Sequence, residues 1–228
     1  MDGASGARGA LVVADGDLPA RASLDASWPG WAAGIDVVVA ADGGALGAER
    51  LGFPIDLVVG DGDSLGESDL ERLATAGVEV RRSPADKDES DTELAVLAAI
   101  ERGAAWIVIV GALGGQRVDH AIANVSLLAL RALGDRPCSI LDETARIRLL
   151  AGPCEMDIEG PPGGLVSLLP LGDVDGVTTE GFVYPLHDER LPMGPARGLS
   201  NVRTMSRSRI AVRSGRLLVV ESPATLSP

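Results

Sequence analysis

The first part of the chain alternates short apolar runs with stretches of helical periodicity. The runs are continuous in Val, Ile and Leu, which is typical of strands covered on both faces of a parallel sheet. They lie at residues 10–15, 35–44, 55–63, 78–82, 104–115 and 138–142. Helical patterns separate them at 43–52, 66–76, 90–102 and 118–133. This repeat predicts a doubly wound α/β domain with a mostly parallel sheet.

Two of these helices have clear end signals. Ser90 followed by Glu93 forms a capping-box pattern, and the helix that it begins ends before Gly103. The last helical pattern places Ile122 on its apolar face and ends at Gly134. We therefore expect Ile122 to be buried.

The pattern changes after about residue 145 to short β-like segments separated by Gly and Pro. Ser214 and Gly215 lie between two alternating segments and predict a tight hairpin turn. These features predict a smaller antiparallel β-sandwich. We expect domains at residues 1–143 and 144–228.

Composition limits the classes of partner and compartment. The chain has 228 residues, 46% of them hydrophobic, and a formal net charge of −13. Such a charge argues against nucleic acid and anionic membranes as partners. Cys138 and Cys154 have no metal-binding or disulfide-rich spacing, and no segment approaches the ~20 apolar residues of a membrane span. We expect a cytoplasmic protein.

Aspartates follow four successive predicted strands. Their carboxylates are expected to gather, because the carboxyl ends of parallel strands lie at one edge of a sheet. The strand ends and the loops that follow carry Asp42, Asp61 and Asp63, then Asp86, Lys87, Asp88 and Asp91, and then Arg117, Asp119 and His120. The pattern indicates a ligand site at this edge.

Asp61 and Asp63 are separated by Gly62, so in extended geometry both carboxylates project to one side. Two ionised carboxylates so close repel each other unless one is protonated or a cation lies between them. Mg²⁺ suits such oxygen ligands, particularly together with substrate phosphates. We therefore predict a magnesium site.

Lys87 and Arg117 lie among these acids, where they could bind phosphate oxygens. No dinucleotide-binding or P-loop glycine pattern is present. The two histidines, His120 and His187, share no motif and indicate no nucleophile arrangement. The residues favour metal-assisted phosphoryl-type transfer without naming the acceptor.

Four ordered segments resemble the thiamine pyrophosphokinase (thiamine diphosphokinase) family. They are residues 41–64, 83–96, 110–128 and 179–201. The resemblance implies an α/β domain that binds ATP and Mg²⁺, a β domain that binds thiamine, and a homodimer with its site between subunits. It implies transfer of pyrophosphate from ATP to the hydroxyethyl group of thiamine, giving thiamine diphosphate and AMP.

The resemblance also implies roles for particular residues. Asp61, Asp63 and Asp91 would be the metal ligands and, with Arg117, the catalytic residues. Nucleotide and phosphate contacts would come from Asp42, Gly43, Lys87, Asp88, Asp119 and Asn124. Ser200 and Asn201 would contact thiamine.

One departure from the family is Gly62, which stands where the family usually has an aromatic residue. Three alternatives remain open at this point. They are a pyrophosphokinase for another hydroxymethyl heterocycle such as a pterin, a glycosyltransferase using Asp61 and Asp63, and a non-catalytic metal- or thiamine-binding module. The segment "RGLSN" (197–201) favours thiamine among them, because it belongs to the vitamin-binding half of the family.

Overall fold

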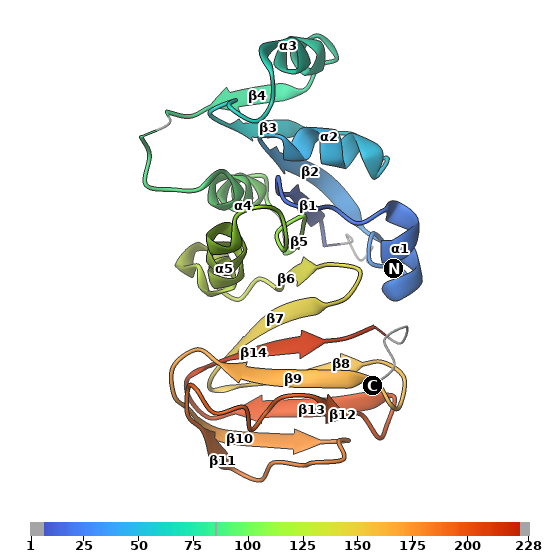
Figure 1. Ribbon diagram of the computed structural model, residues 1–228, viewed down its shortest axis with the longest axis vertical. Helices are drawn as coiled ribbons and strands as arrows, with labels where there is room; N and C mark the ends of the chain where they lie inside the picture. Colours follow the sequence, from blue (N-terminus) through green and yellow to red (C-terminus); the bar gives the residue numbers. More distant parts are fainter. Residues whose placement is uncertain (1–6, 85, 224–228) are drawn as a thin grey trace, which may run out of the picture. The chain divides into compact units, whose positions relative to one another are not determined.

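The computed structural model describes residues 7–84 and 86–223 (Figure 1). The chain divides into two compact units, the first ending at Asp142 and the second beginning at Glu143. None of the helices in the described ranges combines the length and the apolarity needed to cross a bilayer.

The first unit contains a sheet of parallel strands in the order β6-β5-β1-β2-β3-β4. The strands are β1 (Gly9–Val13), β2 (Ile35–Ala41), β3 (Leu57–Gly60), β4 (Glu79–Arg82), β5 (Trp106–Val110) and β6 (Cys138–Leu141). Chain order runs outward from β1 to β4, and then returns to β5 and β6 on the other side of β1. This reversal confirms the predicted doubly wound arrangement, with its switch point between β1 and β5.

Helices connect these strands. Because the crossovers are right-handed, the helices before the reversal and the helices after it lie on opposite faces of the sheet. They are α1 (Arg21–Ser27), α2 (Gly44–Arg50), α3 (Glu67–Thr75), α4 (Asp91–Glu101) and α5 (Val118–Ser126), followed by the 3₁₀ turns η1 (Leu127–Ala129) and η2 (Arg131–Leu133). In Figure 1, α1 and α2 lie to the right of the strands, and α4 and α5 to the left.

Two details differ from the sequence prediction. The helix predicted over 118–133 ends at Ser126 and continues as 3₁₀ turns, and Ile122 is 65% exposed rather than buried. Helix α1 was not predicted, because its seven residues contribute only Leu24 to the core and so give a weak periodic signal.

Strands β1, β2, β3 and β5 are largely buried, as the continuous apolar runs predict, whereas the edge strand β4 is mostly exposed. Leu11 and Val13 pack with Leu24 of α1 and Ala48 of α2. Helix α4 packs on β1, β2 and β3, where its small buried side chains, such as Ala95, allow close approach. This packing fixes the first residue of α4, Asp91, near the sheet.

The second unit is an antiparallel sandwich, as predicted. One sheet pairs strands in the order β12-β9-β14-β7, and the other in the order β11-β10-β13-β8. The strands are β7 (Arg146–Ala151), β8 (Cys154–Glu159), β9 (Leu165–Pro170), β10 (Val174–Glu180), β11 (Glu189–Leu191), β12 (Asn201–Val202), β13 (Arg207–Val212) and β14 (Arg216–Glu221). Alternate residues from both sheets, including Leu168, Ile210 and Leu217, form one core.

The hairpin predicted at Ser214 and Gly215 is wrong. Strand β13 pairs with β8 and β10, whereas β14 pairs with β7 and β9, so the turn carries the chain from one sheet to the other. Ser214 instead bridges Asp175, which follows the start of β10. The alternating pattern was correct for two half-buried strands, but it does not say which partners they take.

Candidate active site

Three aspartates from separate elements converge at the carboxyl edge of the parallel sheet. Asp42 follows β2, Asp61 follows β3, and Asp91 is the first residue of α4. One carboxylate oxygen of each lies within 4.8 Å of the others. Segments distant in the sequence therefore place three negative charges around one point.

Asp42 is the most buried member of this group, at 3% exposure. Its backbone is left-handed (φ 45), a conformation that Asp adopts more readily than most residues. Its carboxylate accepts hydrogen bonds from the backbone N–H groups of Ser64 (3.1 Å) and Leu65 (3.2 Å). Burial nevertheless raises the pKa of Asp42 to about 6, and the charges of Asp63 and Asp91 act in the same direction.

Asp63 lies beside Asp42 rather than in the three-carboxylate group. Its side chain is a hydrogen-bonding neighbour of the Asp42 carboxyl, and it accepts a 3.2 Å hydrogen bond from the Ser64 hydroxyl. These contacts lower the pKa of Asp63 while that of Asp42 is raised, so Asp42 is the member of this pair that keeps its proton to the higher pH.

The Asp61-Gly62-Asp63 segment forms a turn rather than the extended strand end that the sequence suggested. Strand β3 ends at Gly60, and the Asp63 backbone N–H donates to Asp61 Oδ1 at 3.1 Å. The closest triad thus contains Asp42 in place of the Asp63 of the predicted ligand set. The turn accounts for the exchange, because it brings Asp63 alongside Asp42.

Asp15, at the end of β1, is a fifth acid at this edge that sequence reasoning missed. Its carboxylate lies over Gly43, where an added Cβ would be only 2.2 Å from Asp15 Oδ1. Partial burial raises the pKa of Asp15, a hydrogen bond with Ser64 opposes this, and the charges of Asp63 and Asp91 add to the rise. The signal was available, because Asp15 follows an apolar run as the other aspartates do.

The loops after β1 and β5 are joined at the switch point of the sheet. The Gly16 N–H donates to the Gly111 carbonyl at 2.9 Å, and the Gly115 N–H donates to the Asp17 carboxylate at 2.8 Å. A Cβ on Gly16 would lie 2.4 Å from the Gly111 oxygen, so only glycine fits there. Open α/β sheets bind ligands in the crevice at this position.

Lys87 is the cation nearest to the carboxylates. Its ammonium group donates to Asp91 Oδ1 at 2.6 Å and to the Ser83 hydroxyl at 2.7 Å, and its side chain is largely buried. The Ser90 hydroxyl accepts from the Glu93 N–H at 3.1 Å, which confirms the predicted cap. Lys87 and this cap together fix Asp91.

The other residues predicted for phosphate binding are arranged differently. Arg117 and Asp119 form an exposed ion pair with each other, and this pair holds the pKa of Asp119 at about 2. Asn124 is buried and donates to the Ala112 carbonyl at 3.1 Å, which anchors α5 to the loop after β5. Asp88 and His120 are exposed.

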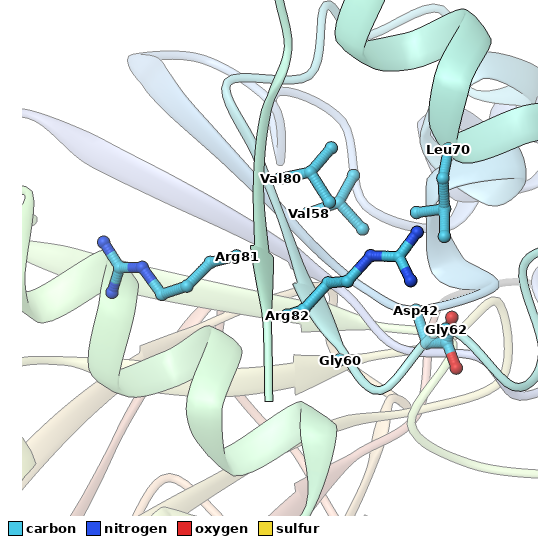
Figure 2. A pocket seen from close by; sticks show the side chains of 8 residues that line it. All are labelled: Asp42, Val58, Gly60, Gly62, Leu70, Val80, Arg81 and Arg82. Atoms are coloured by element: carbon cyan, nitrogen blue, oxygen red, sulfur yellow. The ribbon is translucent and has the colours of Figure 1, made fainter. Parts of the chain in front are cut away.

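A small pocket lies beside the acidic residues, between α3 and the edge strands (Figure 2). Val58, Val80 and Leu70 give it apolar walls, and Asp42 borders it. In Figure 2 the Arg82 side chain reaches toward Leu70 and Gly62, whereas that of Arg81 points away. Gly62 has φ +83, and a Cβ there would lie 3.1 Å from Leu70 Cδ1, so glycine suits this turn.

The two residues predicted to contact thiamine lie in the second unit. Asn201 is buried, and its amide holds the backbone of Tyr184 by accepting from the N–H (3.1 Å) and donating to the carbonyl (2.7 Å). Ser200 is exposed, with φ 55, and its N–H donates to the Ser167 hydroxyl at 3.0 Å. Asn201 thus positions the exposed Tyr184 loop, and His187 farther along is also exposed.

The acidic group fits a divalent cation with oxygen ligands. Three carboxylate oxygens are within 4.8 Å of one another, and the charges of Asp63 and Asp91 add to the burial that raises the pKa of Asp42. Mg²⁺ is held by such carboxylates together with substrate phosphates. Asp42, Asp61 and Asp91 are the residues that could hold it.

Comparisons with known proteins match both units of the chain. A family model for the thiamin pyrophosphokinase catalytic domain matches residues 31–135, and one for its vitamin B1 binding domain matches residues 155–217. Thiamine pyrophosphokinase of Bacillus subtilis is 30% identical over 165 residues, covering 72% of this chain and 76% of that protein. The chain belongs to the thiamine pyrophosphokinase family.

Solved structures of this family share the fold over nearly the whole chain. The crystal structure of thiamine pyrophosphokinase from Bacillus subtilis superposes with a TM-score of 0.80 at 26% identity, covering 95% of this chain and 99% of that one. That of thiamin pyrophosphokinase from Geobacillus thermodenitrificans gives 0.80 at 28% identity, covering 96% and 100%. The acidic group lies within the catalytic match, except for Asp15, which precedes it.

Proposed function

We propose that this protein is a thiamine diphosphokinase that transfers pyrophosphate from ATP to the hydroxyethyl group of thiamine. The observation that carries the proposal is the convergence of Asp42, Asp61 and Asp91, in a chain of this family, at the sheet edge where open α/β folds bind ligands. Family membership favours neither a pterin acceptor nor a binding module without catalysis.

Mg²⁺ is the metal that these carboxylates suit, and when bound it would neutralise polyphosphate charge. In the proposed reaction the thiamine hydroxyl oxygen forms a bond to the β-phosphorus of ATP. The bond from that phosphorus to the oxygen bridging the α-phosphorus breaks, and AMP leaves with the electron pair. The hydroxyl proton passes to a base.

The chain's own residues contribute charge and position. Asp42, Asp61 and Asp91 would hold the cation that binds the polyphosphate, and Asp63 adds negative charge beside Asp42. Lys87 supplies a fixed positive charge beside Asp91, and Arg117 can turn from Asp119 toward phosphate because both are exposed. Asp88 and Gly43 complete the proposed nucleotide contacts, and Asn124 holds the loop beside them.

The remaining assignments are part of the same proposal. We propose that the first domain, residues 1–143, binds ATP, and that the second, residues 144–228, binds thiamine through Ser200 and the loop that Asn201 holds. We propose a cytoplasmic homodimer with its site at the subunit interface. Sedimentation velocity of the full chain tests the dimer.

The reaction is tested by incubating the protein with ATP, Mg²⁺ and thiamine. We expect AMP and thiamine diphosphate in equal amounts, and neither product when EDTA replaces Mg²⁺. Replacing thiamine with a hydroxymethyl pterin in a parallel reaction tests the acceptor. Formation of ADP, or turnover only with the pterin, contradicts the proposal.

A further inference from the structure

A second charged group lies in the sandwich. Most of its residues lie outside the span that the family model of this unit matches. Glu221 at the end of β14 is almost completely buried, with a side chain 1% exposed. It accepts hydrogen bonds from three guanidinium groups, those of Arg146, Arg148 and Arg203. Arg146, Arg148 and Glu221 lie outside the matched span 155–217.

The sheet register produces this group. Arg146 lies directly opposite Glu221 on the neighbouring strand β7, and Arg148, two residues along, faces the same side. Leu150, Leu217 and Val219 continue this face into the apolar core of the sandwich. The charged group therefore occupies one end of the sandwich interior.

Arg203 reaches the group from the residue after β12, with a side chain only 3% exposed. Gly160 lies against its guanidinium, where an added Cβ would be only 3.1 Å from the Arg203 Cζ. The loop between β8 and β9 therefore packs closely on this guanidinium at Gly160.

Arg148 and Arg203 share one carboxylate, that of Glu221, and so carry an excess of one positive charge between them. Among the described residues, Arg148 and Arg203 pair with no carboxylate other than Glu221. Burial lowers the pKa of both arginines, yet arginine keeps its proton in proteins, so the excess charge remains. Burial alone would raise the pKa of Glu221, but hydrogen bonds and charges of the arginines outweigh it and lower that pKa.

Two hydrogen-bond donors in this group have no acceptor within residues 7–84 and 86–223. Arg148 Nε and Arg203 Nη1 are both buried and lack a hydrogen-bond partner in this part of the chain. Leaving one buried charged donor unpaired is costly, and two on adjacent guanidiniums are unusual. The Arg148 side chain is 22% exposed, so part of the group borders solvent.

We propose that Arg148 and Arg203, held together with Arg146 around Glu221, form a binding site for a phosphate-type oxyanion, because these two arginines supply charge and donors that Glu221 alone cannot match. The ligand is either free phosphate or the phosphoryl group of a small metabolite. Guanidinium groups suit it because they present several donors to tetrahedral oxygens. This site is positively charged, whereas the acidic group of the first unit is negatively charged. The proposal does not depend on the proposed transfer reaction.

The test is calorimetric titration of the full chain with inorganic phosphate in EDTA, at constant ionic strength set with sodium chloride. EDTA removes Mg²⁺, and without a cation the five carboxylates of the acidic group repel phosphate. Any binding that remains is then not at the acidic group. We expect saturable binding at one site per chain. A parallel titration with phenyl phosphate separates the two ligand sources, since a metabolite site prefers the monoester and a free-phosphate site does not.

Three variants sharpen the test. Arg148→Met should weaken phosphate binding at least about tenfold, because a charge-assisted hydrogen bond is lost. Arg216→Met, an exposed arginine at the other end of β14, should leave it unchanged. Glu221→Gln removes the only negative charge of the group and should tighten binding.

The outcomes are decisive. Absence of saturable binding, equal affinity of the two arginine variants, or weaker binding by folded Glu221→Gln would each overturn the site. Asp61→Asn should bind phosphate as the unmodified chain does. A change in the phosphate affinity of that variant would show that phosphate binds at the acidic group. It would refute the arginine site, whatever the transferase assay shows.

Discussion

The acidic group of the first unit and the arginine group of the second both concentrate one sign of charge, but they are built differently. Asp42, Asp61 and Asp91 come from loops and a helix start, and the one cation paired with them in the described structure is Lys87, which contacts Asp91. The arginines come mainly from strand register and surround a carboxylate of the same chain.

The difference teaches what each group does for the protein. Strand-end loops can move and can accept an external cation, so like charges there are kept for a ligand. A carboxylate fixed between strands is part of the folded structure, and its loss leaves charges buried without compensation. Removing a charge from the acidic group should therefore affect activity, whereas removing Glu221 should affect stability.

The largest expected effect is that of Asp61→Asn on turnover. We expect kcat to fall at least about a thousandfold, equivalent to about 4 kcal/mol, because a metal ligand is lost. The melting temperature should not fall, since one of several repelling charges is removed. AMP release and differential scanning calorimetry measure the two effects. Glu71→Gln, an exposed acid on α3, is the matched control and should retain full activity.

Glu221→Ala should have the opposite profile. Three arginines lose their shared buried partner, so the free energy of unfolding should fall by about 3 kcal/mol or more. Urea denaturation of this variant and of Glu180→Ala, an exposed glutamate on β10, gives the comparison. If both variants have the same midpoint, the arginine group is not a structural charge centre.

The pH dependence of stability distinguishes the acidic group further. Because the pKa of Asp42 is about 6 in the folded protein against 3.8 ordinarily, the folded state retains a proton that the unfolded state has lost. In metal-free buffer the free energy of unfolding should therefore fall as pH rises from about 5 to about 6. Asp15 acts in the same direction, and the lowered pKa of Asp63 acts below this range.

Asp42→Asn should flatten this pH dependence without abolishing it, because Asp15 remains. Chemical denaturation at a series of pH values measures the slope for both proteins. A slope that is equal in the two, or one that rises with pH in the unmodified protein, contradicts the assignment to Asp42.

The smallest effect is expected from Ser90→Ala, which removes the cap of the helix that begins at Asp91. The free energy of unfolding should fall by about 1 kcal/mol. Ser90→Asp retains a capping oxygen and should restore most of the stability. Circular dichroism melts check both variants, and no loss in the alanine variant would show that Lys87 and packing alone hold the helix start.

The sequence predicted the layers better than the connections. Continuous Val and Ile runs identified the parallel sheet, since strands buried on both faces have no polar positions. The turn at Ser214 was misassigned because alternation reports one buried face and not the neighbouring strand. Helix 118–133 was predicted too long, since apolar spacing continues past Ser126 although the hydrogen bonding does not.

The candidate site was predicted in outline. Aspartates after successive strands indicated convergence, but the turn at Gly62 that brings Asp63 to Asp42 depends on backbone angles no motif specifies. The arginine group could not be found in the sequence at all. Arg146 and Glu221 are 75 residues apart and meet only through strand pairing.

Gly43 has a right-handed helical backbone (φ −56) that any amino acid adopts, so glycine is required there only for space. The space is filled by the Asp15 carboxylate. An alanine at position 43 would displace that carboxylate from the sheet edge rather than unfold the chain. In an alignment of relatives, positions 15 and 43 should therefore covary: an acid at the first occurs only with glycine at the second.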